Sequence, residues 1–256
     1  MLIALTREIS PAIARCELTH LERQAIDLDL ARAQHRAYEA CLIEAGCLVE
    51  RLAAAPDMPD SVFIEDTALV FDELAIVTRP GAVSRRTETA VVAEALRRYR
   101  ALHHIKPPGT VDGGDVLVAG RRVLVGRSSR TNNAGIEQMR RLLAPHGYVI
   151  EAIDVHGCLH LKSAATSIGD DLLLMNPRWL PPGPFASFDR INVHPDEPSA
   201  ANGLRIGDRV IYSTAFPRTR ERMEQRGLHV SAVEGSEIAK AEGAVTCCSL
   251  IFTTSG

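Results

Sequence analysis

The chain has 256 residues, of which 46% are hydrophobic and 24% charged, and its formal net charge is −3. This balance excludes a disordered chain and predicts a soluble globular protein whose core is large enough to fold without disulfide or metal staples. The sequence has no block of lysine and arginine of the kind that binds nucleic acid or an anionic membrane surface, so it favours a small-molecule partner.

The chain carries no recognisable targeting signal. The apolar run at the N-terminus is too short for the hydrophobic region of a signal peptide, and no later run is long enough to span a bilayer. We therefore expect a cytoplasmic protein that does not insert into membranes. The six cysteines are scattered without a CxxC pair, so neither a disulfide framework nor a zinc ribbon is predicted.

A pattern of a short β-hairpin followed by a helix recurs along the chain. Runs of β-branched residues around Gly or Asp turns predict the hairpins, and apolar residues spaced by three and four predict the helices. In chain order the pattern predicts strand 2–7, helix 29–45, strands 67–71 and 74–78, helix 87–100, strands 116–118 and 123–125, helix 134–145, hairpins turning at Gly169-Asp170 and Gly207-Asp208, a helix ending near Gly227, and strand 244–252.

The two ends of the chain are predicted to complete a fifth repeat. Residues 2–7 read like residues 74–79, the second arm of a hairpin, and strand 244–252 would supply the first arm. Five repeats of roughly 50 residues, closed by pairing of the terminal strands, predict a five-bladed α/β propeller of ββαβ type. We expect one domain, residues 1–256, with a central channel. An open α/β sheet of unrelated hairpins is the alternative.

A cysteine and a histidine are candidates for nucleophilic chemistry. Cys247-Cys248 lies in the apolar run 243–252, which predicts a buried strand whose end presents one thiol to the channel. Two buried cysteines acting as small hydrophobic side chains are the alternative interpretation. A thiolate nucleophile needs a base or a cationic environment, and His160, in an apolar and strand-like context, is the candidate partner. A structural role is the alternative for this histidine, and His103-His104 is predicted at a helix end.

Acidic residues enter the first two complete hairpins at equivalent places. Asp60, Glu65 and Asp66 precede the first hairpin, and Asp112 and Asp115 precede the second. Carboxylates beside apolar strands are costly unless they are paired, and a cationic ligand would supply the pairing. Ordinary turn formation is the alternative.

Two arginines occupy matching positions after the second strands of these hairpins. They are Arg85 and Arg130. The forked donors of a guanidinium suit a substrate carboxylate. Solvated residues at the start of a helix are the alternative interpretation for both.

Taken together, these residues resemble the dimethylarginine dimethylaminohydrolase family of the pentein, or guanidino-modifying, superfamily. The resemblance extends over nearly the whole chain. It rests on segments 60–66 (DSVFIED), 78–86 (TRPGAVSRR), 112–116 (DGGDV), 126–132 (GRSSRTN), 159–162 (LHLK), 200–202 (AAN), 217–220 (PRTR) and 246–249 (TCCS).

The resemblance implies a role for each candidate residue. Cys247 matches the family nucleophile, His160 its general acid/base, and Asp66 and Asp112 the carboxylates that hold the guanidinium. Some family members carry Glu at the position of Asp112. The other residues implied in substrate binding are Asp60 for the α-amino group, Glu65 in support, Arg85 and Arg130 for the carboxylate, Leu18 in a flap over residues 16–27, and Ala241.

The activity implied by the resemblance is hydrolysis of an Nω-methylated arginine to citrulline and an alkylamine through a covalent S-alkylthiouronium cysteine. It implies no cofactor and no metal, and it is compatible with a homodimer. Two alternatives stay open. One is another guanidino-group hydrolase such as an arginine deiminase, although those chains are longer and carry a helical insertion. The other is a non-catalytic pentein binding protein, which would lack the Cys–His–carboxylate set.

Overall fold

The computed structural model describes residues 1–254. The contacts divide the chain into two compact units. The first unit contains residues 1–65 and the chain from residue 203 onward, and the second contains Asp66–Asn202. Each unit buries its own hydrophobic core. Within residues 1–254, no helix combines the length and apolar character needed to cross a membrane.

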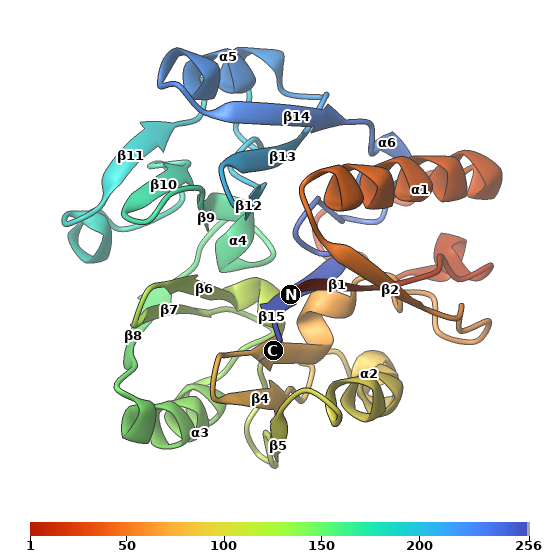
Figure 1. Cartoon of the computed structure of the whole chain (residues 1–256), viewed down its shortest axis with the longest axis vertical. Coiled ribbons are helices and arrows are strands. Elements are labelled where there is room, and N and C mark those ends of the chain that lie inside the picture. The colour runs from red at the N-terminus through yellow and green to blue at the C-terminus, as the bar shows by residue number, and fades with distance from the viewer. Residues whose placement is uncertain (255–256) are drawn as a thin grey trace. The chain divides into compact units, whose positions relative to one another are not determined.

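Residues 1–254 form five three-stranded sheets that share one plan (Figure 1). In each sheet two strands form an antiparallel pair, and the third strand runs parallel to the middle one. A parallel neighbour cannot be reached by a tight turn, so the chain crosses over before adding the third strand, in most sheets through a helix. This connectivity confirms the predicted ββαβ repeat.

The second unit contains three of these sheets. Their elements are η2 (Ile64–Thr67, beginning in the first unit), β3 (Ala68–Val70), β4 (Leu74–Val77), η3 (Val83–Glu88), α2 (Thr89–Leu96) and β5 (Ala101–His104); η4 (Gly113–Asp115), β6 (Val116–Ala119), β7 (Arg122–Arg127), α3 (Asn133–Leu143), η5 (Ala144–His146) and β8 (Val149–Asp154); and α4 (Leu161–Ala164), β9 (Ala165–Ser167), β10 (Leu172–Met175), η6 (Gly183–Phe185) and β11 (Asp189–Asn192).

The first unit contains the other two sheets. Their elements are β12 (Gly203–Ile206), β13 (Arg209–Ser213), α5 (Pro217–Gln225), β14 (His229–Val233) and α6 (Ser236–Ala239), and β15 (Ser249–Thr253), β1 (Leu2–Arg7), η1 (Ile13–Arg15), α1 (Leu28–Glu44) and β2 (Leu48–Leu52).

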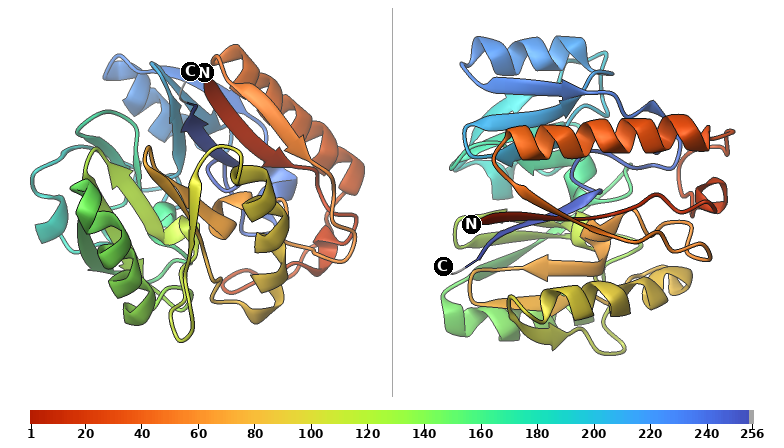
Figure 2. Two further views of the ribbon diagram at one scale, coloured as in Figure 1. Left: turned by 60° about the horizontal axis from the view of Figure 1, so that its bottom comes forward. Right: turned by 45° about the vertical axis from the view of Figure 1, so that its right-hand side comes forward.

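The predicted pairing of the two terminal strands is confirmed. β1 and β15 are antiparallel, with Leu2 opposite Thr253 and Thr6 opposite Ser249. Beyond the strands, the Thr254 N–H donates to the Met1 carbonyl over 2.8 Å, so the two ends lie side by side (Figure 2). The fifth repeat is therefore assembled from segments at opposite ends of the chain.

Three local predictions were wrong. The helix predicted over 87–100 is a 3₁₀ helix followed by α2, which ends at Leu96, and His103-His104 belongs to β5. That strand covers the edge of β4, which would otherwise keep unpaired backbone groups.

The strand predicted over 244–252 begins only at Ser249, because the Cys247 N–H donates to the Ala244 carbonyl in a turn. His160 is not in a strand either. It is the extended residue that directly precedes α4.

Candidate active site

Three buried side chains of the second unit form a carboxylate–histidine cluster. Asp66 lies in η2, Asp112 directly precedes η4, and His160 directly precedes α4. His160 Nε2 lies 3.2 Å from Asp112 Oδ2, and the Gly114 N–H donates to Asp66 Oδ1 over 2.9 Å. One ligand atom from each of the three lies within 4.8 Å of the others, so a single cation can contact all of them. A planar guanidinium or a metal ion would satisfy this requirement.

Gly114 allows this close approach. A Cβ atom at Gly114 would lie 2.6 Å from His160 Nδ1 and 3.1 Å from Asp66 Oδ1. No side chain fits at the first of these distances, so only glycine lets the η4 backbone lie against the imidazole. The Asp-Gly-Gly-Asp motif is therefore part of the packing around His160 as well as a turn.

Asp115 positions the backbone next to His160. Its carboxylate accepts hydrogen bonds from the Leu161 N–H, over 3.0 Å, and from Ser128 Oγ, over 2.6 Å. Because Leu161 directly follows His160, these bonds fix the start of α4. From the sequence alone Asp115 could be recognised only as an acid at a hairpin entrance, and this supporting role was missed.

The charges in the cluster stabilise one another. Burial alone would raise the pKa of Asp66, but the positive charges of His160 and Arg85 outweigh it and hold that pKa at about 2. Burial alone would lower the pKa of His160, but the negative charge of Asp66 and the hydrogen bond to Asp112 raise it to about 9. At neutral pH the imidazole is therefore a cation that can donate a proton.

This shift predicts a pH-dependent stability. The folded pKa of His160, about 9, exceeds its ordinary value of 6.5, so its contribution is fully present below pH 6.5 and is lost as the pH rises through 9. We expect up to about 3 kcal/mol of unfolding free energy to disappear over that window. Urea unfolding of the wild type and of His160→Gln at pH 6 and pH 9.5 measures it. An equal pH dependence in the two proteins would contradict the assignment.

Arg85 is buried in the same cluster. Its Nη1 donates to Asp66 Oδ2 over 2.6 Å, and its Nη2 donates to Glu88 over 2.9 Å. Burial opposes the charge, but Asp66 and Glu88 raise the pKa of Arg85 well above its ordinary value. The structure thus gives Arg85 a contact that orients Asp66, and Glu88, missed from the sequence, completes the ion pair. The role of Arg85 in holding a substrate carboxylate stays a prediction.

The loops that follow β4 and β7 meet at Gly81 and Arg130. A Cβ atom at Gly81 would lie 2.5 Å from the Arg130 Cα, and the Gly81 N–H donates to Asp112 Oδ1 over 2.8 Å. The backbone carrying Arg130 is therefore held beside a residue that bonds to the cluster. Arg130 is half-buried, and its role in holding a substrate carboxylate stays a prediction.

Cys247 lies in a turn that Glu65 holds at two points. The Glu65 N–H donates to the Cys247 carbonyl over 3.1 Å, and Thr246 Oγ1 donates to Glu65 Oε2 over 2.9 Å. Both residues belong to the first unit, and Glu65 is buried. The Glu65 side chain thus anchors the residue that precedes Cys247, and its part in substrate binding stays a prediction.

The two adjacent cysteines differ in their surroundings. Cys248 is buried, and burial together with the nearby Glu65 raises the pKa of its thiol to about 12, so it is uncharged at neutral pH. Cys247 is only half-buried and is accessible to a reactant. Since the thiolate is the reactive form of cysteine, Cys248 is unsuited to act as the nucleophile.

The remaining predicted residues also lie in the first unit. Both oxygens of Asp60 accept the Glu17 N–H, over 3.1 and 3.2 Å. Leu18 packs, half-buried, against the core cluster that contains the buried Ala241. The structure therefore brings together Cys247, Glu65, Asp60, Leu18 and Ala241 in one unit, and Asp66, Asp112, Arg85, Arg130 and His160 in the other.

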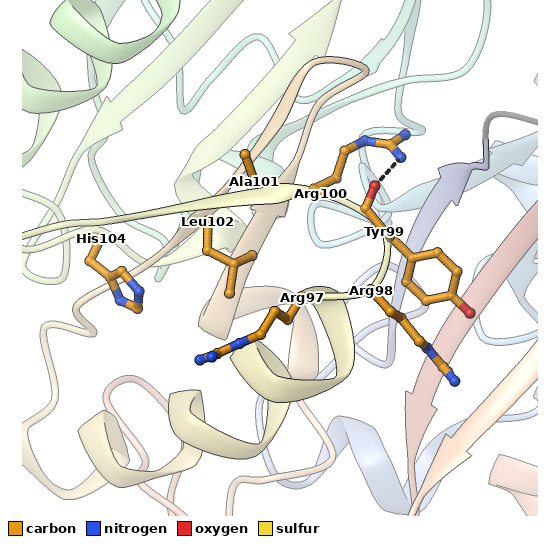
Figure 3. A pocket seen from close by; sticks show the side chains of 7 residues that line it. All are labelled: Arg97, Arg98, Tyr99, Arg100, Ala101, Leu102 and His104. Carbon is orange, nitrogen blue, oxygen red and sulfur yellow. Dashed lines mark hydrogen bonds between the residues drawn. The ribbon is translucent and has the colours of Figure 1, made fainter.

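Two surface hollows contain none of the predicted residues. One, of about 640 Å³, lies along the turn from α2 into β5 and is lined by Arg97–Leu102 and His104 (Figure 3). The other, of about 200 Å³, is lined by residues that include His35, Arg36 and Arg51. Neither hollow is lined by a residue of the motifs that carry the resemblance, so cavity size does not locate the candidate site.

Comparisons with known proteins assign the chain to a family. A sequence model of the arginine deiminase family matches residues 48–203. The N(G),N(G)-dimethylarginine dimethylaminohydrolase of Streptomyces coelicolor is 40% identical over 249 residues, which cover 96% of this chain and 95% of that protein. The protein of the same name from Pseudomonas aeruginosa is 37% identical over 88% of this chain and 90% of its own. The chain belongs to the dimethylarginine dimethylaminohydrolase family.

Solved structures of this family superpose on nearly the whole chain. A Cys-to-Ser mutant of the dimethylarginine dimethylaminohydrolase from Pseudomonas aeruginosa, complexed with citrulline, is 33% identical, has a TM-score of 0.94, and is matched over 97% of this chain and 98% of that chain. The N-terminal domain of ArgZ, a cyanobacterial arginine dihydrolase, has a TM-score of 0.90 at 17% identity, covering 99% of both chains, and shares the fold. The α/β fold of this chain is therefore shared with a dimethylarginine dimethylaminohydrolase and with a more distant arginine dihydrolase.

Proposed function

We propose that this protein hydrolyses Nω-methylated arginine to citrulline and an alkylamine. The observation that carries the proposal is the buried cluster of Asp66, Asp112 and His160, in which the two carboxylates can accept the N–H groups of a guanidinium and the protonated His160 can act as an acid. Two relatives support it by name, and the related structure with bound citrulline contains the product. The proposed site unites this cluster with Cys247.

The course of the chain supports a single site that contains both Cys247 and the cluster of Asp66, Asp112 and His160. Glu65 hydrogen-bonds the turn that carries Cys247, and the next residue along the chain is Asp66, which belongs to the cluster. Consecutive Cα atoms are separated by about 3.8 Å. Cys247, the proposed nucleophile, is therefore hydrogen-bonded to Glu65, and Asp66, a proposed guanidinium-binding carboxylate, directly follows Glu65 in the chain.

In the first half-reaction Asp66 and Asp112 bind the guanidinium and orient its central carbon toward Cys247. The thiolate forms a C–S bond and a tetrahedral adduct. His160, protonated at neutral pH, gives its proton to the departing amine nitrogen as the C–N bond breaks. The products of this step are an alkylamine and an S-alkylthiouronium enzyme.

In the second half-reaction the neutral His160 accepts a proton from water, which attacks the same carbon. Collapse of the new tetrahedral adduct breaks the C–S bond, releases citrulline and restores the thiolate. One histidine therefore serves as acid and then as base. The net reaction consumes one water molecule for each amine released.

The rest of the predicted architecture belongs to the same proposal. We propose that the five ββαβ repeats close into one propeller domain whose central channel holds the site. The channel would place the half-buried Cys247 thiol against a trapped substrate. We propose that the protein is a homodimer in the cytoplasm.

Citrulline release from asymmetric dimethylarginine, monomethylarginine, arginine and agmatine tests the function. We expect turnover of the methylated substrates and a loss of about 10–200-fold for each methyl-sized group missing from a pocket shaped to hold it. Agmatine lacks the α-carboxylate and should be a poor substrate. Preferential turnover of arginine would instead identify an arginine deiminase, the activity named by the matching family model. No release from any of the four would contradict the proposal.

A further inference from the structure

The segment between η1 and α1 is exposed and lacks regular structure. Residues 19–25 are solvent-exposed, whereas Leu18 is half-buried. Backbone N–H groups in such a segment need acceptors other than a helix or sheet. Their acceptors here are carboxylates from elsewhere in the first unit.

Glu242 accepts hydrogen bonds from three of these N–H groups. Its carboxylate accepts the N–H groups of Thr19 over 3.0 Å, His20 over 2.5 Å and Leu21 over 2.7 Å. Three consecutive N–H groups converging on one carboxylate form an anion-binding nest. Hydrogen bonds to an ionised acceptor are stronger than neutral ones. One side chain thus binds three consecutive residues of this segment.

The backbone of Glu242 is in an unfavourable conformation. Its φ is +58°, which makes it the non-glycine residue with positive φ among residues 1–254. It follows α6, where its N–H donates to the Ala239 carbonyl, a position that favours glycine. Backbone strain of this kind points to a functional constraint.

The turn that carries Glu242 is fixed against the core. A Cβ atom on Gly243 would lie 2.3 Å from the ring of Phe63, so the backbone here packs directly on a buried side chain. The Gly243 N–H also donates to the Ile238 carbonyl over 3.0 Å. Glu242 therefore projects from a rigid support, and α6 itself packs against α1 (Figure 1).

A second carboxylate holds the other side of Leu18. Asp60 accepts the Glu17 N–H with both oxygens, over 3.1 and 3.2 Å. Asp60 is also the group proposed to receive the α-amino group of the substrate. A bound substrate would then compete with Glu17 for Asp60, while the Glu242 contacts are unaffected. Residues 19–21 would keep their hydrogen bonds to Glu242.

We infer that Glu242 is a positioning residue that holds residues 17–21 at the amino-acid end of the substrate site while the substrate occupies Asp60. The inference rests on the proposed function. It assigns Glu242 a part in substrate affinity and none in bond breaking. Losing Glu242 should therefore raise KM and leave kcat nearly unchanged.

Replacement of Glu242 by glycine separates this role from a structural one. Glycine suits the positive φ, so Glu242→Gly should unfold at the same urea concentration as the wild type or a higher one. The amide protons of Thr19, His20 and Leu21 should nevertheless exchange about tenfold faster with solvent, because their acceptor is gone. KM for asymmetric dimethylarginine should rise about tenfold, with kcat within about twofold of wild type.

Two further variants serve as controls. Glu242→Gln keeps one carbonyl oxygen, and Oε1 alone accepts the His20 and Leu21 N–H groups, so this variant should be intermediate. Glu234→Gln alters a carboxylate that also binds backbone N–H groups, those of Gly235 and Ser236, and should change neither the exchange at 19–21 nor KM.

The inference is overturned by unchanged exchange at residues 19–21 in Glu242→Gly. It is also overturned by faster exchange with an unchanged KM, since the segment would then be held without serving the substrate. If the proposed function is wrong, the wild-type protein will show no turnover of asymmetric dimethylarginine. The hydrogen-exchange measurement does not depend on turnover, so the two failures can be told apart.

Discussion

Cys247→Ser should abolish citrulline release, with kcat lower by on the order of 10⁴-fold or more. A serine hydroxyl is not ionised at neutral pH and cannot replace the thiolate as nucleophile. The substitution is small and the side chain is half-buried, so the fold and substrate binding should survive. Steady-state citrulline release measures the loss, and calorimetric binding of asymmetric dimethylarginine shows that the site is intact.

Cys248→Ser is the matched control, because it makes the same chemical change one residue away. The Cys248 thiol is buried, and its pKa is raised to about 12, so it contributes no thiolate. We expect a loss of stability of about 1–3 kcal/mol from burying a hydroxyl, with kcat within about threefold of wild type. If the Cys248 variant were inactive and the Cys247 variant active, Cys248 would be the nucleophile and the assignment of Cys247 would be wrong.

His160→Ala should block turnover of asymmetric dimethylarginine and should accumulate a covalent intermediate only with a substrate whose leaving group needs no proton. An amine leaving group needs a proton, so turnover of asymmetric dimethylarginine should fall by about 10²–10⁴-fold. S-methyl-L-thiocitrulline forms an adduct with a His-to-Gly mutant of a family member. Its methylthio group departs as methanethiolate when the C–S bond to that group breaks, so this step does not need a proton from His160. We therefore expect rapid adduct formation and slow hydrolysis with this substrate, seen by intact-protein mass spectrometry.

The double variant with Cys247→Ser provides the control for that experiment. Without the thiol, no mass increase should appear. Absence of an adduct in His160→Ala itself, in a protein that still unfolds cooperatively, would argue that His160 is not the group that activates water.

The sequence predicted the repeated plan of the fold because each hairpin carries its own local signal. Alternating β-branched residues with Gly or Asp turns identify β3–β4 and β6–β7, and the likeness of residues 2–7 to 74–79 identified the terminal pairing. The third strand of each sheet was harder to predict from the sequence. β5 begins five residues after α2 ends and carries two histidines, so its formation depends on pairing with β4.

The candidate site was predicted mainly through its recurring residue types. Acids and arginines at equivalent places in two repeats were visible in the sequence, and the cluster of Asp66, Asp112 and His160 shows that distant segments converge. The supporting contacts were not visible. Glu88 and Glu242 look like ordinary surface acids in the sequence, and only the folded backbone shows that one binds Arg85 and the other a run of N–H groups.

Because Met1 and Thr254 are in contact, the same repeats could follow one another along the chain from a different starting point. Because the first strand is already paired with the last, a short peptide joining the ends would cross little space, and the chain could be reopened at an exposed hairpin such as the one at Gly207. Such a circular permutant would keep all ten strand pairings while beginning in a different repeat.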